Sequence, residues 1–399
     1  MNPTISNLYE IAKKNNKRII GLMSGTSLDG LDIAVCNFTG HGLDTTITVE
    51  QFETLAYNDE FRKDVLSIFS KEQVNLEKLC LLNALIGTVH ATMINKCLQK
   101  WSISNSTVDI IASHGQTIYH APQSLHKQLN YPNATLQIGD GDHIAVNTGI
   151  LTLSDFRQKH IAAGGEGAPL AIYGDYLIFG KKGENRVMLN IGGIANFTFL
   201  SGTMLLNEVF STDVGPGNTL MDAFIQKEFA GKNFDENATI ALQGKTNQSL
   251  LDALKQHPFF TQSFPKTTGP ELFNLDYLYK AIKVSNTTHL SKYDIMATLN
   301  RFTAEAIVNA LQTSVPVNNY SIYISGGGMH NTLLMQHLQE LLPTISIKTT
   351  QDLNIHPDAK EAVLFAILAN ECLSNPNNNI LKNSNGIPSI AMGKISLPN

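Results

Sequence analysis

The sequence predicts an α/β protein with two domains and largely parallel sheets. Apolar runs of strand length alternate with longer runs of helical spacing along the 399 residues, which is typical of this class. A strand that turns on glycine and returns as a second strand occurs twice, in Gly21–Val35 and in Met188–Thr198. Glycine lets the backbone approach a ligand closely, and successive free N–H groups form a concavity for anions. The duplication therefore predicts two domains that hold one phosphate chain between them.

Composition and charge exclude several classes of partner. Hydrophobic residues make up 43% and charged residues 16% of the chain, as in ordinary globular proteins. The net charge of −5 provides no basic field, so we expect neither nucleic acid nor a membrane surface as a partner. No apolar run approaches the roughly 18 residues of a membrane span, and the polar N-terminus lacks the apolar core of a signal peptide. The four cysteines show no metal-ligand spacing, which favours reduced thiols in the cytoplasm.

The first part of the chain is expected to form a lead-in and one domain. Met1–Lys17 is polar and predicts a short helix or a flexible segment before a strand at Arg18–Met23. Apolar spacing then predicts helices over Asp59–Ser70 and Asn75–Gln99, and strands over Val108–Ala112, Thr135–Ile138 and Ile150–Leu153. The cluster Gly139–Asp142 predicts a turn, and Ala162–Pro169 leads into a further helix.

The second part of the chain predicts the other domain. After the second hairpin, Leu205–Phe210 leads to a turn at Ser211–Asn218 and a helix over Asn218–Phe229, and Gly231–Asn274 is polar and helix-poor. The later elements are a helix over Ala297–Thr313, a strand over Tyr320–Ile324, and helices over Asn331–Leu342 and Ala359–Ser374. We therefore expect a lead-in of residues 1–17, a first domain of residues 18–150 with 362–399, and a second domain of residues 151–361.

The turn of the first hairpin carries residues suited to a nucleotide. Hydroxyl groups can bond phosphate oxygens, and an aspartate can hold Mg²⁺ through water. The candidate cofactor-binding residues are Gly25, Thr26, Ser27, Leu28, Asp29, Gly30, Leu31 and Asp32. The alternative is an ordinary hairpin with a polar tip, and the second hairpin argues against that alternative.

Two further glycine turns complete the predicted nucleotide site. The second hairpin contributes Gly192, Gly193 and Asn196. The run Gly326, Gly327 and Gly328 stands between a predicted strand and a predicted helix, a place that suits adenosine or phosphate. The alternative for this run is a tight packing turn.

Charged residues near the turns are candidates for the chemistry. Asp213 precedes Gly215–Gly217 on a predicted strand-to-helix turn, where a carboxylate is well placed as a general base. The alternative is a turn or helix-capping aspartate. Asp155 and Arg157 could hold the hydroxyls and carboxylate of a sugar acid, with a structural ion pair as the alternative. Gln116 is a candidate polar contact at the end of a strand.

Several stretches together resemble a known family. Gly21–Val35, Asn190–Asn196 and Ser325–Asn331 resemble the first phosphate, second phosphate and adenosine motifs of the actin-like ATPase superfamily. The sequence of these motifs resembles the anhydro-N-acetylmuramic acid kinase family more closely still, and this resemblance extends from about Arg18 to Ser374. Its hallmarks are Gly21–Gly30, Ser113–Thr117, Gln137–Asp140, Asp155–Arg157, Ala163–Leu170, Asn190–Asn196, Asp213–Asn218, Pro265–Gly269 and Gly326–Gly328.

The resemblance implies two actin-like, ribonuclease H-like domains that face each other across a nucleotide cleft. It implies a cytoplasmic phosphotransferase of murein recycling that uses ATP and Mg²⁺ and forms a homodimer. Water would open the 1,6-anhydro ring of anhydro-N-acetylmuramic acid while ATP phosphorylates O6, giving N-acetylmuramic acid 6-phosphate and ADP. Asp213 matches the catalytic carboxylate, and Gln116, Asp155, Arg157, Glu166 and Gly167 fall in the stretches expected to contact the sugar.

The chain departs from the family pattern at three places. Glu166 stands where glutamine is usual, Gln158 follows Arg157 where further arginines are usual, and Pro270 replaces an arginine. Two other interpretations stay open: a kinase of the same superfamily for another sugar or a carboxylic acid, and a nucleotide-operated binding or assembly protein. The second needs the nucleotide motifs but not Asp155, Arg157 and Asp213, so those residues favour an enzyme.

Overall fold

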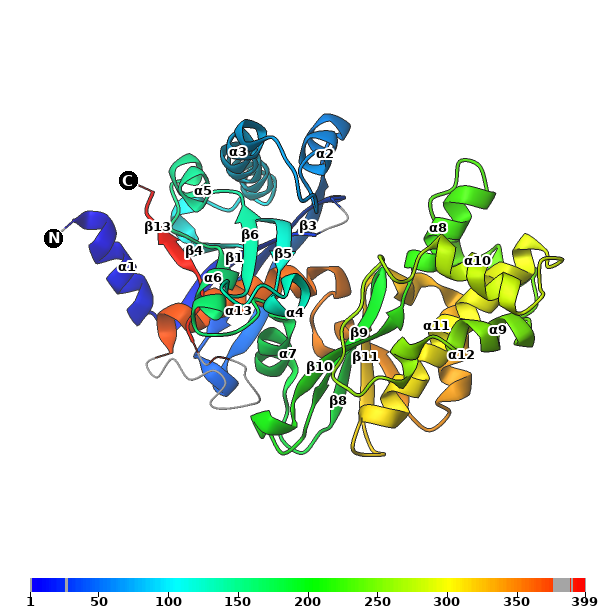
Figure 1. The fold of residues 1–399 in the computed structure, drawn as a ribbon. Coiled ribbons are helices and arrows are strands. Elements are labelled where there is room, and N and C mark those ends of the chain that lie inside the picture. Colours follow the sequence, from blue (N-terminus) through cyan, green and yellow to red (C-terminus); the bar gives the residue numbers. More distant parts are fainter. Residues whose placement is uncertain (1, 26–27, 376–387, 389, 399) are drawn as a thin grey trace. The chain divides into compact units, whose positions relative to one another are not determined.

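The chain folds into two compact α/β units, as the sequence predicts. The computed structural model describes residues 2–25, 28–375, 388 and 390–398. One unit comprises Met1–Gly180 with Asn354–Asn399, and the other comprises Lys181–Leu353 (Figure 1). The expected borders lie at residues 150 and 361. The first unit extends past residue 150 because strand β7 (Thr152–Ser154) pairs with β4 (Ile110–Ser113) in its sheet.

The sheet of the first unit has six strands in the order β13-β7-β4-β1-β2-β3. Its remaining strands are β1 (Asn16–Ser24), β2 (Gly30–Thr39), β3 (Thr46–Ala56) and β13 (Lys394–Ser396). The hairpins β1–β2 and β2–β3 and the edge pair β13–β7 are antiparallel, whereas β1–β4 and β4–β7 are parallel.

The sheet of the second unit repeats this plan in the order β10-β9-β8-β11-β12. Its strands are β8 (Arg186–Ile191), β9 (Ile194–Leu200), β10 (Phe210–Pro216), β11 (Ser321–Ser325) and β12 (Ser346–Thr349). The three strands β8 to β10 form antiparallel hairpins, and β8–β11 and β11–β12 are parallel. The two glycine-turn hairpins predicted from the sequence therefore belong to two sheets of similar topology. The expectation of largely parallel sheets is wrong, because strands joined by such short turns must run in opposite directions.

Helices cover both faces of the first sheet. Ile20 and Leu22 of β1 share a core with Leu82 and Ile86 of α3 (Leu76–Lys100), while Gly21 between them faces α13 (Lys360–Ser374). The other helices of this unit are α1 (Pro3–Lys13), α2 (Asp59–Leu66), α4 (Gln123–His126), α5 (Gly141–Thr148), α6 (Phe156–Ala162) and α7 (Ala171–Phe179). The short strands β5 (Gln116–Ala121) and β6 (Ala134–Ile138) form a separate antiparallel hairpin.

Helices of the second unit bury two cores. The helices of this unit are α8 (Thr219–Glu228), α9 (Gln248–Lys255), α10 (Leu275–Val284), α11 (Lys292–Ser314) and α12 (Thr332–Leu341). Helix α9 lies in a stretch expected to be helix-poor. It has only eight residues, but Asn247 caps its N-terminus and Leu250, Leu251 and Leu254 are buried.

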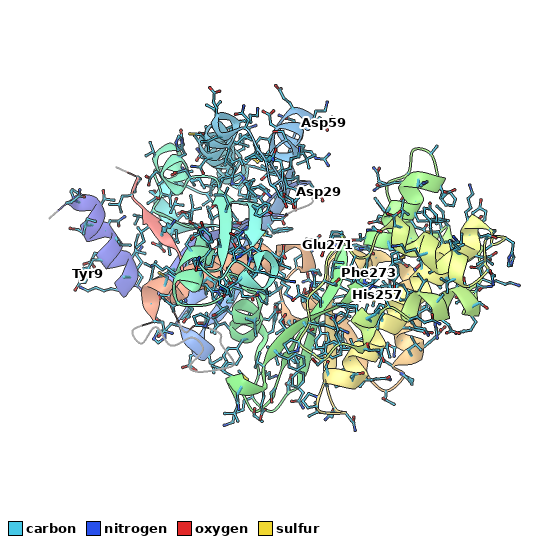
Figure 2. The ribbon with its side chains drawn as sticks, in the orientation of Figure 1. Tyr9, Asp29, Asp59, His257, Glu271 and Phe273 are labelled. Atoms are coloured by element: carbon cyan, nitrogen blue, oxygen red, sulfur yellow. The ribbon has the colours of Figure 1, made fainter. Side chains whose placement is uncertain are left out.

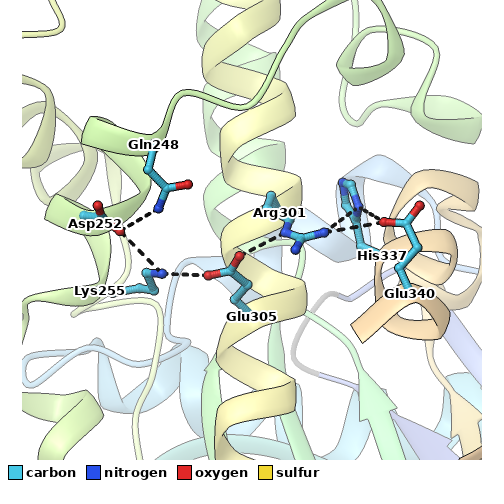
Figure 3. Close-up of polar contacts among 7 residues, drawn as sticks. All are labelled: Gln248, Asp252, Lys255, Arg301, Glu305, His337 and Glu340. Atoms are coloured by element: carbon cyan, nitrogen blue, oxygen red, sulfur yellow. Dashed lines mark hydrogen bonds and ion pairs between the residues drawn. The ribbon is translucent and has the colours of Figure 1, made fainter. Parts of the chain in front are cut away.

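A chain of charged side chains ties three of these helices together. Lys255 on α9 donates to Glu305 on α11 at 2.6 Å, and Glu305 accepts from Arg301 at 2.9 Å (Figure 3). Arg301 also pairs with Glu340 on α12 at 3.5 Å. The ion pairs thus connect α9, α11 and α12 within the second unit.

Candidate active site

The predicted residues of the first unit gather at one edge of its sheet. Strands β1, β4 and β7 are parallel neighbours and end at Ser24, Ser113 and Ser154. Because their carboxyl ends meet at the same edge, the residues that follow them, Gly25, His114 and Asp155, lie along it. Thr26 and Ser27, also predicted to contact nucleotide, lie outside the described residues.

A series of buried hydrogen bonds between side chains supports the turn of the first hairpin. The Tyr57 hydroxyl donates to Ser24 Oγ at 2.9 Å, and Ser24 Oγ donates to Gln116 Oε1 at 2.6 Å. Gln116 Nε2 in turn donates to the carbonyl of Gly25 at 3.4 Å. Tyr57 has only one proton to donate, so His90 Nε2, 2.8 Å from its oxygen, must donate to it. Burial lowers the pKa of His90 to about 4, so at neutral pH the ring is neutral and its one proton is on Nε2.

Arg157 is held by His114 beside the same edge. Its Nη1 donates to the carbonyl of Gly167 at 2.7 Å, and its Nε lies 3.3 Å from His114 Nε2. Burial, and then the neighbouring guanidinium, hold the pKa of His114 well below its usual range, so Nε2 is free to accept. Burial lowers the pKa of Arg157 only to about 10, so it stays charged at neutral pH.

Asp155 and Glu166 have other hydrogen-bond partners than Arg157. Asp155 Oδ2 accepts from Lys394 on β13 at 2.6 Å, and its Oδ1 is a buried atom without a partner. The pairing expected as the alternative, between Asp155 and Arg157, is therefore replaced by an ion pair with Lys394. Glu166 is exposed and accepts from the Ser124 hydroxyl at 3.3 Å.

Carboxylates of the first unit gather near the turn of the β1–β2 hairpin, where Asp29 lies (Figure 2). Burial raises the pKa of Asp32 to about 6, although the Thr54 hydroxyl donates to it at 2.5 Å. The other carboxylates that raise it are those of Glu361, Asp358 and Asp29. Within the described part of the chain, no three His, Cys, Asp or Glu side chains are arranged to hold a metal ion by themselves.

The turn of the β8–β9 hairpin is hydrogen-bonded to the residues that precede α8. The backbone N–H groups of Gly217 and Asn218 donate to the carbonyls of Gly193 and Gly192, each at 2.8 Å. Asn196 on β9 stands opposite Asp213 on β10 in the register of the two strands. The pairing brings the predicted phosphate turn and the predicted base to neighbouring strands of one sheet.

The glycine run packs against the same hairpin. A Cβ at Gly326, where φ is +84°, would lie 2.6 Å from Asn190 Oδ1, and one at Gly328 would lie 2.2 Å from the Ile191 side chain. Gly327 and Gly192 differ, because a Cβ there would meet no atom closer than 3.9 Å and 3.7 Å. Packing within the protein thus explains Gly326 and Gly328 but leaves an open backbone surface at Gly192 and Gly327.

Asp213 lies inside β10, at a bulge before Gly215, and not on the strand-to-helix turn expected from the sequence. The bulge arises because Val214 is an extra residue in β10: Asp213 pairs with Asn196, and Gly215 pairs with the next residue of β9, Ala195. Asp213 Oδ2 accepts from the backbone N–H of Thr268 at 2.9 Å. Burial raises the pKa of Asp213 to about 6, and the Thr268 N–H counteracts that rise. A carboxylate with this pKa is ionised at neutral pH and is a competent proton acceptor.

Comparison with known proteins decides the family. The family described as anhydro-N-acetylmuramic acid kinase matches residues 17–396. The chain belongs to that family. It is 54% identical over 400 residues, all of both chains, to the anhydro-N-acetylmuramic acid kinase of Pseudoalteromonas atlantica. It is 38% identical over 393 residues to that of Caldanaerobacter subterraneus, covering 98% of this chain and 99% of the relative.

A solved structure of a more distant protein aligns over most of the chain. The activator of the 2-hydroxyisocaproyl-CoA dehydratase from Clostridium difficile with bound ADPNP covers 92% of this chain and 99% of its own, at 12% identity and a TM-score of 0.44. No helix among the described residues is long and apolar enough to cross a membrane.

The positions at which the chain departs from the family pattern have defined surroundings. Gln158 Nε2 donates to the carbonyl of Thr135 at 2.7 Å, within the first unit. Pro270 is exposed, three residues before the buried Phe273. Neither residue is among the described hydrogen-bond partners of the Asp213 and Arg157 side chains, which are Thr268, His114 and Gly167.

Sequence reasoning missed the residues that support the site from within. Tyr57 follows β3, and His90 lies in the middle of α3. A lone histidine among apolar residues is the only signal at His90, and more often it marks a satisfied core residue. The support by Thr268 was equally hidden, since a backbone N–H leaves no trace in the sequence.

Proposed function

We propose that this kinase opens the 1,6-anhydro ring of anhydro-N-acetylmuramic acid with water and phosphorylates the released O6 from ATP. The products are N-acetylmuramic acid 6-phosphate and ADP. The observation that carries the proposal is Asp213: it is partly buried, its pKa is near 6, and a backbone N–H holds one of its oxygens. A plain kinase acts on a hydroxyl that already exists, whereas ring opening needs a base for water.

Asp213 serves as that base in the proposed reaction. Its carboxylate takes a proton from water, the water oxygen bonds to C1, and the C1–O6 bond breaks. The electron pair of that bond stays on O6, which bonds to the γ-phosphorus while the bond to the β–γ bridging oxygen breaks and ADP leaves. The protein contributes orientation and charge placement, as is usual in phosphoryl transfer.

Arg157 is the proposed partner of the lactyl carboxylate of the sugar. Its guanidinium is charged, and its described partners are a neutral histidine and a carbonyl, which leave the positive charge uncompensated by direct contact. A planar guanidinium suits a carboxylate because two parallel hydrogen bonds can form. Gln116, Asp155, Glu166 and Gly167 remain proposed contacts of the same sugar.

The nucleotide is proposed to bind over the open glycine surfaces. Gly192, Gly193 and Asn196 would face the phosphates, and Gly326, Gly327 and Gly328 the adenosine, because the backbone at Gly192 and Gly327 has room for close approach. The first-hairpin residues Gly25 to Asp32 would take the other side of the phosphate chain. Mg²⁺ bound with ATP neutralises phosphate charge, and one or two carboxylates such as Asp29 and Asp32 suit it, since Mg²⁺ keeps several waters and phosphate oxygens as ligands.

The remaining features are proposed because the chain belongs to this family. The two units would be actin-like domains facing across the nucleotide cleft. The active form would be a homodimer in the cytoplasm, where ATP is available.

A direct assay tests the proposed function. The purified protein is incubated with ATP and anhydro-N-acetylmuramic acid, and the sugar product is weighed by mass spectrometry. We expect a gain of one water and one phosphoryl group. Arg157→Met should raise KM for this sugar at least tenfold while leaving KM for ATP near the wild-type value. A product that gains only a phosphoryl group would overturn ring opening.

A further inference from the structure

The Lys266 ammonium occupies a box of aromatic rings beside the proposed base. Its Nζ lies 4.3 Å from the ring centres of both Phe259 and Phe264 and 5.9 Å from that of Phe260. It donates to the carbonyl of Phe259 at 2.8 Å. The residue is only 8% exposed, and its pKa is lowered by burial with no carboxylate acting against that effect. A cation is thus buried on aromatic faces and one carbonyl.

The backbone of the same residue is joined to β10 around Asp213. The N–H of Asp213 donates to the carbonyl of Lys266 at 3.0 Å, and the N–H of Lys266 donates to the Thr212 hydroxyl at 3.0 Å. Two residues later, the Thr268 N–H donates to Asp213 Oδ2. Lys266 therefore pairs with β10 through its backbone and with the aromatic box through its side chain.

We propose that Lys266 is a positioning residue, whose side chain anchors the segment Phe264–Thr268 so that the Thr268 N–H stays directed at the Asp213 carboxylate. The inference rests on the proposed role of Asp213 as the base and deepens it. It assigns a task to one lysine of the stretch Pro265–Gly269, a stretch that family resemblance marks without giving it a role.

The ammonium acts through the segment and not as a charge on the base. The groups that shift the pKa of Asp213 are its burial, the Thr268 N–H and the carboxylate of Glu271, and Lys266 is not among them. Glu271, which Figure 2 labels with Phe273, raises this pKa and so opposes the Thr268 N–H. Burying a cation without a carboxylate is costly, and an apolar side chain would pack in the box at lower cost. What lysine adds is a directional bond to the Phe259 carbonyl.

The test compares Lys266→Met with Lys292→Met. Methionine keeps the length of the side chain and removes the ammonium. Lys292 is the matched control, because its Nζ lies 4.2 Å from the Phe229 ring in the same unit but on the exposed helix start of α11. The first readout is kcat/KM for the anhydro sugar against pH at saturating ATP. The second is hydrogen exchange of the peptide that spans residues 259–268.

Lys266→Met should move the acid limb of the pH profile upward by about one pH unit, since a weakened hydrogen bond to the carboxylate favours its protonated form. Exchange of residues 259–268 should quicken, and the dissociation constant of ATP should not change. Lys292→Met should leave both readouts at the wild-type values. If Lys266→Met does not fold, Phe264→Leu removes one face of the box and should move both readouts the same way by less.

The outcomes separate this inference from the proposed function. If Asp213→Asn is inactive, an acid limb of the pH profile that does not move in Lys266→Met overturns the inference, whatever the rate of hydrogen exchange. If Asp213→Asn keeps wild-type activity, the proposed role of the base fails. Exchange alone then decides whether Lys266 anchors the segment, and unchanged exchange overturns that anchoring too.

Discussion

Glycines of the nucleotide motifs differ in what the protein itself requires of them. Gly326 has a backbone conformation that favours glycine and a neighbour that leaves no room for a Cβ. Gly327, the next residue, has neither constraint, since the nearest atom to an added Cβ is Asn218 Nδ2 at 3.9 Å. Packing around Gly327 therefore does not by itself require glycine at this position. The proposed close approach of the nucleotide gives a reason for it.

Substitution at Gly327 tests that reason. Gly327→Val should leave the melting temperature within a few degrees of wild type and weaken ATP binding at least tenfold, because the branched side chain fills the proposed nucleotide surface. Calorimetric titration of ATP measures the binding. Gly326→Val is the contrasting variant, which should lower the melting temperature because it meets Asn190 and Ile191. Unchanged ATP affinity in folded Gly327→Val would contradict the assignment.

Individual elements show how much the sequence could predict. The hairpin β1–β2, the long helix α3 and the pair β11–α12 were predicted close to their observed bounds, because their apolar spacing and glycine turns are strong local signals. The predictions missed the eleven-residue strand β3 and the ten-residue helix α10, and also short elements such as β5, α5, α6 and β13, which have three to eight residues each. Elements of that length are stabilised by what they pack against. β13, for instance, is a strand only because it pairs with β7, some 240 residues earlier in the chain.

The candidate site was predictable to the same extent. Motifs predicted the glycine turns where the structure has them, whereas Asp213 lies inside β10 and Arg157 in α6. The contacts that tune these residues come from elements distant in sequence. Tyr57 follows β3, His90 belongs to α3 and Gln116 to β5, and no local pattern links them.

Loss of the Tyr57 hydroxyl should weaken the turn that these elements support. Tyr57→Phe leaves the His90 N–H without its acceptor and Ser24 without its donor, which should lower the free energy of unfolding by about 1–3 kcal/mol. We also expect a severalfold rise in KM for ATP, since Ser24 and Gly25 begin the first turn. The measurements are urea unfolding and steady-state kinetics.

The matched control is Tyr277→Phe. The Tyr277 hydroxyl donates to the carbonyl of Leu254 in the second unit, remote in sequence from the first turn. Its loss should lower the free energy of unfolding by a similar amount without changing KM for ATP. An equal rise in KM for both variants would mean that the chain from His90 to Gln116 has no part in shaping the turn.

Two buried histidines should each lower the stability of the whole molecule in mild acid, whereas the raised pKa of Asp32 and of Asp213 acts in the opposite direction. Burial lowers the pKa of both His90 and His160 to about 4, below the ordinary 6.5 of histidine. At these two residues the unfolded chain therefore binds more protons than the folded chain between these values, and their contribution to the free energy of unfolding falls as pH drops from 6.5 toward 4. The loss is on the order of 1.4 kcal/mol for each pKa unit of difference, before solvent relaxation reduces it.

Denaturant unfolding at pH 7 and pH 5 measures this loss. His90→Gln should reduce the difference between the two pH values, because its side chain does not titrate. His41→Gln, at an exposed position of the same unit, should leave the difference as in wild type. The same difference between pH 7 and pH 5 in His90→Gln as in wild type would show that this imidazole is not held neutral.

The central claim concerns the whole reaction: water attacks the sugar, and the oxygen of the opened ring attacks phosphorus. The most direct test is turnover of anhydro-N-acetylmuramic acid and ATP in ¹⁸O-labelled water, with mass spectrometry of the products. The account predicts one ¹⁸O at C1 of the sugar phosphate and none in its phosphoryl group, and loss of at least about 100-fold in rate for Asp213→Asn. Label found mainly in free phosphate would indicate a nucleotide-hydrolysing protein, and a phosphorylated sugar without label would indicate a plain kinase; either result would contradict the account.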